Sequence, residues 1–114
     1  GLQISIFKRK KGTLFANHYH RGDDPSKNPE KFFLVSGKVK LDAHNGMTGR
    51  KLELIIGEDT EIIILPGIMH TFEALTDVIF LEYRATPFDR QKPDCYLPES
   101  YEEYIKSKKQ KEQL

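Results

Sequence analysis

Residues 12–37 of the chain read GTLFANHYHRGDDPSKNPEKFFLVSG. His18 and His20 lie two positions apart in this stretch, and Glu30 follows them. On a β-strand, residues i and i+2 point to the same face, so the two imidazoles share one face. Such a pair is costly to bury empty but is well suited to holding a metal ion. With His70, which follows a Pro-Gly step, the pattern contains three of the four histidines of the chain.

Short β-type segments flank this stretch on both sides. They alternate apolar with polar residues or are rich in β-branched residues, and turn-forming residues separate them. Ser36 and Gly37 predict a tight hairpin turn, and the region from His44 to Gly49 predicts a second turn. About eight strands of this length indicate an all-β sandwich or barrel. The predicted strands are residues 3–8, 13–20, 31–35, 38–42, 52–56, 61–65, 71–74 and 77–84.

The last part of the chain has a different character. Prolines are spaced along residues 86–98 and predict an extended segment, after which Ser100 and Glu103 fit a capping box that opens a helix. The apolar stripe of this helix consists of Tyr101, Tyr104 and Ile105. We therefore predict a barrel with an extended tail over residues 1–98, and a C-terminal helix with a charged end over residues 99–114.

The spacing of Gly12, His18, His20, Glu30 and Gly37 resembles the first motif of the cupin superfamily. As in that motif, five residues separate Gly12 from His18, and six separate Glu30 from Gly37. The gap between His20 and Glu30 holds nine residues and is longer than the usual form. The extra residues are rich in turn formers, and we expect them to lengthen one hairpin loop without moving the strands.

A later stretch resembles the second cupin motif. It contains Gly57, then Pro66 and Gly67, then His70. The run from Gly57 to Pro66 is longer than usual, and Ala74 stands where that motif often has Asn. The resemblance covers roughly residues 3–84, and it implies a cupin double-stranded β-helix, the jelly-roll barrel.

The resemblance implies that His18, His20, Glu30 and His70 are metal ligands. Three imidazoles and one carboxylate leave coordination positions open, and the set suits a divalent ion such as Zn, Fe, Mn, Ni or Co. The alternative is a cupin that uses these residues as hydrogen-bonding or acid–base groups. The strand parity of the ligands predicts apolar residues deeper in the barrel, namely Leu14, Ala16, Phe32, Leu34, Phe72 and Ala74. The fourth histidine, His44, lies in a His-Asn-Gly turn, and we expect an exposed loop residue there.

The tail carries a second resemblance. Residues 88–96 read FDRQKPDCY and are similar to the end of the cupin domain in bacterial capsule-sugar enzymes. In those proteins the cupin domain follows a nucleotide-sugar reductase domain and epimerises a UDP-linked sugar at a carbon beside a ketone. This chain departs from the pattern at Arg90 and Cys95, which leaves the substrate open. The tail either packs across the barrel or serves the substrate.

These resemblances imply a divalent-metal-dependent isomerase or epimerase that acts on a sugar or nucleotide-sugar. Such a metal polarises the ketone, while a base moves a proton at the neighbouring carbon. Glu82 and Tyr83 are the candidates for this catalytic base, and alternation requires one of the two to face inward. Arg84 and Lys38 are candidates for a phosphate contact at the barrel mouth. Two alternatives remain open: a non-catalytic sugar-binding cupin and an Fe(II)-dependent dioxygenase.

The composition of the chain indicates which kinds of partner and which cellular compartment to expect. The net charge of +1 argues against a nucleic-acid partner, because domains that bind DNA or RNA usually carry a basic excess. No apolar run approaches the roughly 18 residues of a membrane helix, and we expect a cytoplasmic protein without a signal peptide. The single cysteine, Cys95, rules out an internal disulfide. By analogy with small cupins we expect a homodimer, with an apolar interface formed by Phe33, Val35 and the alternate face of residues 62–64.

Overall fold

The computed structural model describes residues 3–25, 29–84 and 94–112. Within these ranges the chain forms eight β-strands followed by a short 3-10 helix and one α-helix, which confirms the predicted fold class. The elements are β1 (Gln3–Arg9), β2 (Leu14–His18), β3 (Glu30–Ser36), β4 (Val39–Asn45), β5 (Arg50–Ile56), β6 (Thr60–Ile64), β7 (Ile68–Ala74), β8 (Val78–Arg84), η2 (Pro98–Ser100) and α1 (Tyr101–Glu112).

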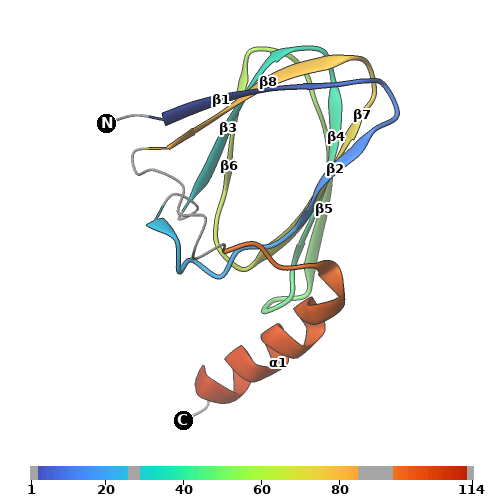
Figure 1. Cartoon of the computed structure of the whole chain (residues 1–114). Helices are drawn as coiled ribbons and strands as arrows, with labels where there is room; N and C mark the ends of the chain where they lie inside the picture. The colour runs from blue at the N-terminus through green and yellow to red at the C-terminus, as the bar shows by residue number, and fades with distance from the viewer. Residues whose placement is uncertain (1–2, 26–28, 85–93, 113–114) are drawn as a thin grey trace.

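The strands form two four-stranded antiparallel sheets that face each other (Figure 1). The first sheet has the strand order β1-β8-β3-β6, and the second sheet has the order β2-β7-β4-β5. Along the chain, β2 lies in the second sheet, β3 in the first and β4 in the second again. The chain therefore crosses between the sheets at both connections, as in a jelly roll.

This topology corrects the two predicted hairpins on either side of β3. Strand β3 pairs with β6 and β8, whereas β4 pairs with β5 and β7, so Ser36 and Gly37 form a corner between sheets. The long connection before Glu30 likewise joins different sheets. Gly37 has a φ of +94°, and a Cβ there would lie 2.3 Å from the carbonyl oxygen of Asp77. Glycine is needed at this corner because two loops pass close to each other.

The second predicted turn is confirmed as the β4–β5 hairpin. Asn45 lies opposite Arg50 at its end, and the backbone N–H of Gly49 donates to the Asn45 carbonyl oxygen at 2.8 Å. The Asn45 side chain also accepts a hydrogen bond from the backbone N–H of Met47 at 3.0 Å. This use of an asparagine side chain inside its own turn is the reason why such residues mark turns in a sequence.

An apolar core fills the space between the sheets. Phe32, Leu34, Phe72 and Ala74 are at most 4% exposed, which confirms the inward orientation predicted for them. The residual cavity in this core measures about 10 Å³, so the middle of the barrel is closed to a ligand. A binding site in the barrel must therefore lie near one of its ends.

Strand β2 departs from the predicted parity. Its register has an irregularity between two pairs, Phe15 with Phe72 and His18 with His70. Three steps along β2 therefore match two steps along β7, which defines a β-bulge, and Ala16 within it has a φ of +53°. Phe15 consequently stacks inside the barrel, while Leu14 is 65% exposed. The inward prediction is wrong for Leu14, whereas Ala16 is half-buried against the core.

Helix α1 lies at one end of the barrel, beside the β4–β5 turn (Figure 1). Its predicted apolar stripe is confirmed, because Tyr101 and Ile105 are buried against Tyr19, which is itself fully buried. Ser100 directly precedes the helix, but the predicted capping box is wrong: Ser100 ends η2, and its hydroxyl donates to the carbonyl oxygen of Leu97 at 3.0 Å instead of capping the N–H of Glu103. The part of the chain that the structure describes has no helix long and apolar enough to cross a membrane.

Candidate metal centre

Both sheets contribute to one cluster of candidate ligands. His18 ends β2 and lies opposite His70 of β7, and His20 follows two residues later. Glu30 is the first residue of β3, in the first sheet. One potential ligand atom from each of the four residues lies within 4.8 Å of all the others. The fold thus brings the four residues singled out from the sequence to one place.

The cluster is buried and tightly spaced. His20, Glu30 and His70 are at most 2% exposed, and His18 is half-buried. The Glu30 carboxylate lies between two imidazoles, with Oε2 3.0 Å from His20 Nε2 and Oε1 3.3 Å from His70 Nε2. Neighbouring ligand atoms on an ion with bonds of about 2.1 Å are about 3 Å apart. The spacing around Glu30 therefore suits a single metal ion.

In His20 and His70, the hydrogen bond made by Nδ1 determines whether Nε2 carries a proton or a lone pair. His20 Nδ1 hydrogen-bonds the backbone carbonyl oxygen of Asp94, and His70 Nδ1 lies 2.9 Å from the carbonyl oxygen of Ile68. A carbonyl oxygen only accepts, so Nδ1 carries a proton in both rings, and in the neutral tautomer Nε2 presents a lone pair. The Nε2 atoms face the Glu30 carboxylate at 3.0 and 3.3 Å, and imidazole nitrogens beside a carboxylate are a donor set that divalent metal ions take. The four residues therefore fit a divalent metal ion.

Asp94 is a site residue whose role the sequence did not predict. It is 2% exposed and lies 74 positions from His20 in the chain. Burial acts to raise the pKa of its carboxyl, but hydrogen bonds from the backbone N–H groups of residues 21–24 outweigh burial and hold this pKa below its ordinary value. The tail motif was the available signal, although residues 88–93 of that motif, Arg90 included, lie outside the described residues. Cys95, the next residue, is exposed.

The two candidate bases on β8 face opposite sides of the first sheet. Glu82 is 7% exposed and lies opposite Phe32 of β3, so it points into the barrel. One of its carboxylate oxygens is 3.2 Å from a guanidinium nitrogen of Arg84, which is also buried. Tyr83 faces outward, where its hydroxyl donates to the Glu61 carboxylate. Burial and this hydrogen bond raise the pKa of Tyr83 to about 12.

The strand register relates these side chains to the cluster. Lys31 lies opposite Tyr83, so the next position along the same register brings Arg84 beside Glu30. Glu82 then lies one inward position deeper, about 7 Å along the strand. Lys38 follows the far end of β3 and is exposed, so it lies away from the cluster, at the other end of the barrel. The candidate phosphate contact is therefore placed near the cluster for Arg84 but not for Lys38.

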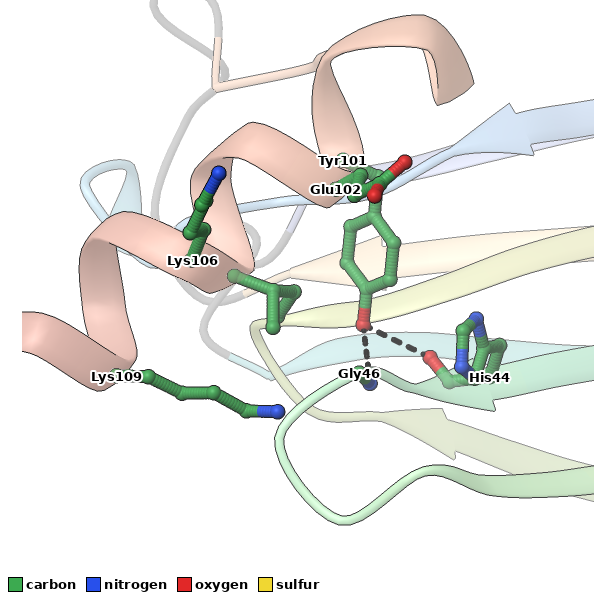
Figure 2. Close-up of a pocket in the computed structure, with 7 residues that line it drawn as sticks. His44, Gly46, Tyr101, Glu102, Lys106 and Lys109 are labelled. Atoms are coloured by element: carbon green, nitrogen blue, oxygen red, sulfur yellow. Dashed lines mark hydrogen bonds between the residues drawn. The ribbon is translucent and has the colours of Figure 1, made fainter.

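His44 lies apart from the cluster. It is on β4 next to Ala43, which pairs with His70, so the side chain of His44 points to the other side of the second sheet. Its ring meets the ring of Tyr101 with centroids 5.6 Å apart, at a surface pocket between α1 and the β4–β5 turn (Figure 2). The prediction of an exposed loop residue is wrong, because His44 belongs to a strand and α1 partly covers it.

Comparisons with known proteins rest on solved structures, since no family model and no curated protein matches the chain. The fold resembles the capsular polysaccharide assembling protein CapF from Staphylococcus aureus, with a TM-score of 0.67 and 28% identity over 83% of this chain. QdtA, a sugar 3,4-ketoisomerase from Thermoanaerobacterium thermosaccharolyticum in complex with TDP, has a TM-score of 0.70 and 12% identity over 93% of this chain and 74% of QdtA. A single-residue variant of oxalate decarboxylase from B. subtilis has a TM-score of 0.67 and 17% identity over 84% of this chain and 24% of that protein.

These likenesses differ in what they establish. The chain spans 26% of the length of CapF, so the match is to one part of that protein. The matches to QdtA and oxalate decarboxylase, at 12% and 17% identity, establish the fold alone. All three share the cupin fold, in agreement with the two-sheet jelly roll described above. The predicted relationship is confirmed, and the chain is a protein of the cupin fold.

Proposed function

We propose that the chain is a metal-binding cupin that isomerises or epimerises a sugar or nucleotide-sugar. Its four proposed ligands, His18, His20, Glu30 and His70, hold one divalent ion such as Zn, Fe, Mn or Ni. The observation that carries the proposal is the buried convergence of three imidazole rings and one carboxylate, each of which offers a ligand atom within 4.8 Å of the others. The likeness to CapF and to the TDP-bound ketoisomerase QdtA supports a sugar or nucleotide-sugar as the small-molecule ligand.

The proposed reaction is proton transfer at a carbon beside a carbonyl group. A bound divalent ion supplies Lewis-acid polarisation of that carbonyl. The Glu82 carboxylate is the proposed base, because it is buried in the barrel and belongs to the strand next to β3. It takes the proton from carbon, and this proton exchanges with solvent on the carboxyl group. In an isomerisation the carboxyl group then protonates a neighbouring atom, whereas in an epimerisation solvent water supplies the proton on the opposite face of the carbon and the proton on Glu82 is released to solvent. Arg84, 3.2 Å away, orients this carboxylate and adds a positive charge for an anionic or hydroxyl-rich substrate.

Solvent hydrogen exchange tests this proposal directly. The metal-loaded protein is incubated in D₂O with UDP- or dTDP-linked 4-keto sugars, and deuterium incorporation beside the ketone is followed by proton NMR. We expect incorporation by the wild type and a fall of about 10² to 10⁴ in its rate for Glu82→Gln, since a positioned base contributes that much. Tyr83→Phe distinguishes the two candidate bases, and we expect its rate to stay within about twofold of wild type because Tyr83 faces outward.

The other outcomes separate the alternative functions. Tight binding of a sugar nucleotide without deuterium incorporation favours a non-catalytic sugar-binding cupin. Oxygen consumption by the iron-loaded protein favours an Fe(II)-dependent dioxygenase. A large rate loss in Tyr83→Phe but not in Glu82→Gln would contradict the assignment of the base.

We also propose a homodimer formed through the outer face of the first sheet. Ile6 and Ile63 on this face are 68% and 52% exposed, and Val35 is 37% exposed. Ile6, Leu81 and Phe33 lie side by side across β1, β8 and β3, so the apolar surface is continuous. Sedimentation velocity is expected to give a dimer mass for the wild type and a monomer mass for Ile6→Lys. A monomeric wild type would contradict this interface.

The cytoplasm is the compartment that we propose for the protein.

A further inference from the structure

The tail residues that follow the barrel bind the loop that follows β2. The Asp94 carboxylate accepts hydrogen bonds from the backbone N–H groups of Arg21 at 2.7 Å, Gly22 at 2.8 Å and Asp24 at 3.1 Å. A carboxylate with three N–H donors is a strong local anchor, because charge-assisted hydrogen bonds are about twice as strong as neutral ones. One buried side chain thus fixes the path of four consecutive residues immediately after His20.

The backbone of the same tail contacts the His-Tyr-His segment itself. The carbonyl oxygen of Asp94 accepts the hydrogen bond from His20 Nδ1. Tyr19 and Tyr96 exchange two backbone hydrogen bonds, of 3.2 and 3.0 Å, as an antiparallel bridge. The Tyr96 ring stacks on the Tyr19 ring with centroids 5.5 Å apart, and the Arg21 guanidinium lies 4.0 Å from the Tyr96 centroid. The tail therefore holds the His20 segment by its backbone and by its side chains.

We propose that Asp94 is the positioning residue for the metal ligand His20. Its carboxylate locks the loop from Arg21 to Asp24 against the tail, and this lock places its own carbonyl oxygen where it orients the His20 imidazole. The inference rests on the proposed metal centre and adds to it the link between the tail and the coordination geometry. Of the two roles predicted for the tail, packing across the barrel and service to the substrate, these contacts concern the packing, which also orients a proposed metal ligand.

Asp94→Asn is the substitution that isolates this role. The shape of the side chain is kept, but an amide has one acceptor oxygen, so its NH₂ group must face N–H donors of the loop. The conflict displaces the tail and with it the carbonyl group that holds His20 Nδ1. Loss of an outer partner of a metal-bound histidine typically costs 10- to 100-fold in metal affinity, and we expect a fall of about this size.

The experiment compares wild type, Asp94→Asn and Asp77→Asn. Asp77 is the matched control, since its carboxylate accepts a backbone hydrogen bond from Lys11 at 2.9 Å in a different pair of loops. Zn(II) affinity is measured by competition with a chromophoric chelator, and the ligand-field absorption spectrum of each protein is recorded at saturating Co(II). We expect Asp94→Asn to bind Zn(II) about 10- to 100-fold more weakly and to show an altered Co(II) spectrum. Asp77→Asn is expected to match the wild type in both.

Each result decides a different claim. Equal affinity and equal spectra for Asp94→Asn and wild type would overturn the positioning role while leaving the metal centre intact. Absence of metal binding by the wild type would overturn the proposed metal centre and this inference with it. If Asp94→Asn does not fold, Tyr96→Ala loosens the same tail through its stacking contacts. We expect a several-fold loss of affinity for that variant, and an unchanged affinity would overturn the proposal.

Discussion

The hydroxyl group of Tyr101 joins helix α1 to the barrel, and its removal should be costly. The backbone N–H of Gly46 donates to this oxygen at 2.8 Å, and the hydroxyl donates toward the carbonyl oxygen of Gly67 at 2.7 Å and that of His44 at 3.0 Å. Gly46 lines the surface pocket, so water can replace the hydroxyl there (Figure 2). The contact with Gly67 is buried, so that carbonyl loses its partner without replacement.

The expected cost of Tyr101→Phe follows from these two situations. Loss of the bond to Gly46 costs about 1 kcal/mol, and the buried Gly67 carbonyl adds about 1–3 kcal/mol. The free energy of unfolding should fall by about 2–4 kcal/mol, which lowers the urea midpoint by about 1–2 M at an m value of about 2 kcal/mol/M. Tyr104→Phe is the matched control, because the contacts described for Tyr104 are made by its ring, which stacks on Tyr19. A loss below about 0.5 kcal/mol for Tyr101→Phe, or an equal loss for Tyr104→Phe, would show that the Tyr101 hydroxyl does not stabilise the docking of α1.

Three further predictions concern the barrel and are measured by urea unfolding. The pKa of Tyr83 is raised to about 12, so the folded state keeps a proton that the unfolded chain releases near pH 10. The stability linked to Tyr83 is present below pH 10 and is lost as the pH rises toward 12. In Tyr83→Phe the free energy of unfolding should therefore fall less steeply with pH over this range. An unchanged slope of the free energy of unfolding against pH would contradict this prediction. Gly49 has a φ of +77° and open space around it, so Gly49→Ala should lower the free energy of unfolding by about 1 kcal/mol. Gly37→Ala should lower it by at least about 2 kcal/mol more, because a Cβ there meets the carbonyl oxygen of Asp77. Equal losses would contradict the close approach of the two loops at Gly37. Phe15→Ala should cost about 3 kcal/mol and Leu14→Ala less than about 0.5 kcal/mol, and the reverse order would exclude the bulge.

The eight strands were predictable because alternation and turn residues are local signals. The pairing of the strands was not predictable. Alternation of apolar and polar residues indicates which side of a strand faces the core, but it does not indicate which strand lies beside it. The corner at Gly37 therefore looked like a hairpin, although β3 and β4 lie in different sheets. The bulge at Ala16 was also hidden, since one extra residue in a strand changes its parity without changing its composition. The inward prediction for Leu14 is wrong for this reason.

In the candidate site, too, the features with local sequence signals were predictable and the long-range contacts were not. The four candidate ligands were predictable from spacing, because His-x-His is local and the Pro-Gly step marks the approach to His70. The contact of Asp94 with His20 joins residues 74 positions apart, so no periodicity could show it. Alternation along β8 required one of Glu82 and Tyr83 to face into the barrel, and burial shows that Glu82 is the inward residue.

Metal content of the purified protein tests directly whether His18, His20, Glu30 and His70 form a metal centre. Elemental analysis is performed on untagged wild type beside His18→Ala, His70→Ala and His44→Ala, all loaded with divalent metal and then desalted. We expect about one ion per chain in the wild type and in His44→Ala, whose histidine points away from the cluster. We expect loss of the ion in His18→Ala and His70→Ala, which remove imidazoles from the cluster. A wild type that retains no metal, or retention of metal by both cluster variants, would show that these residues do not form a metal centre.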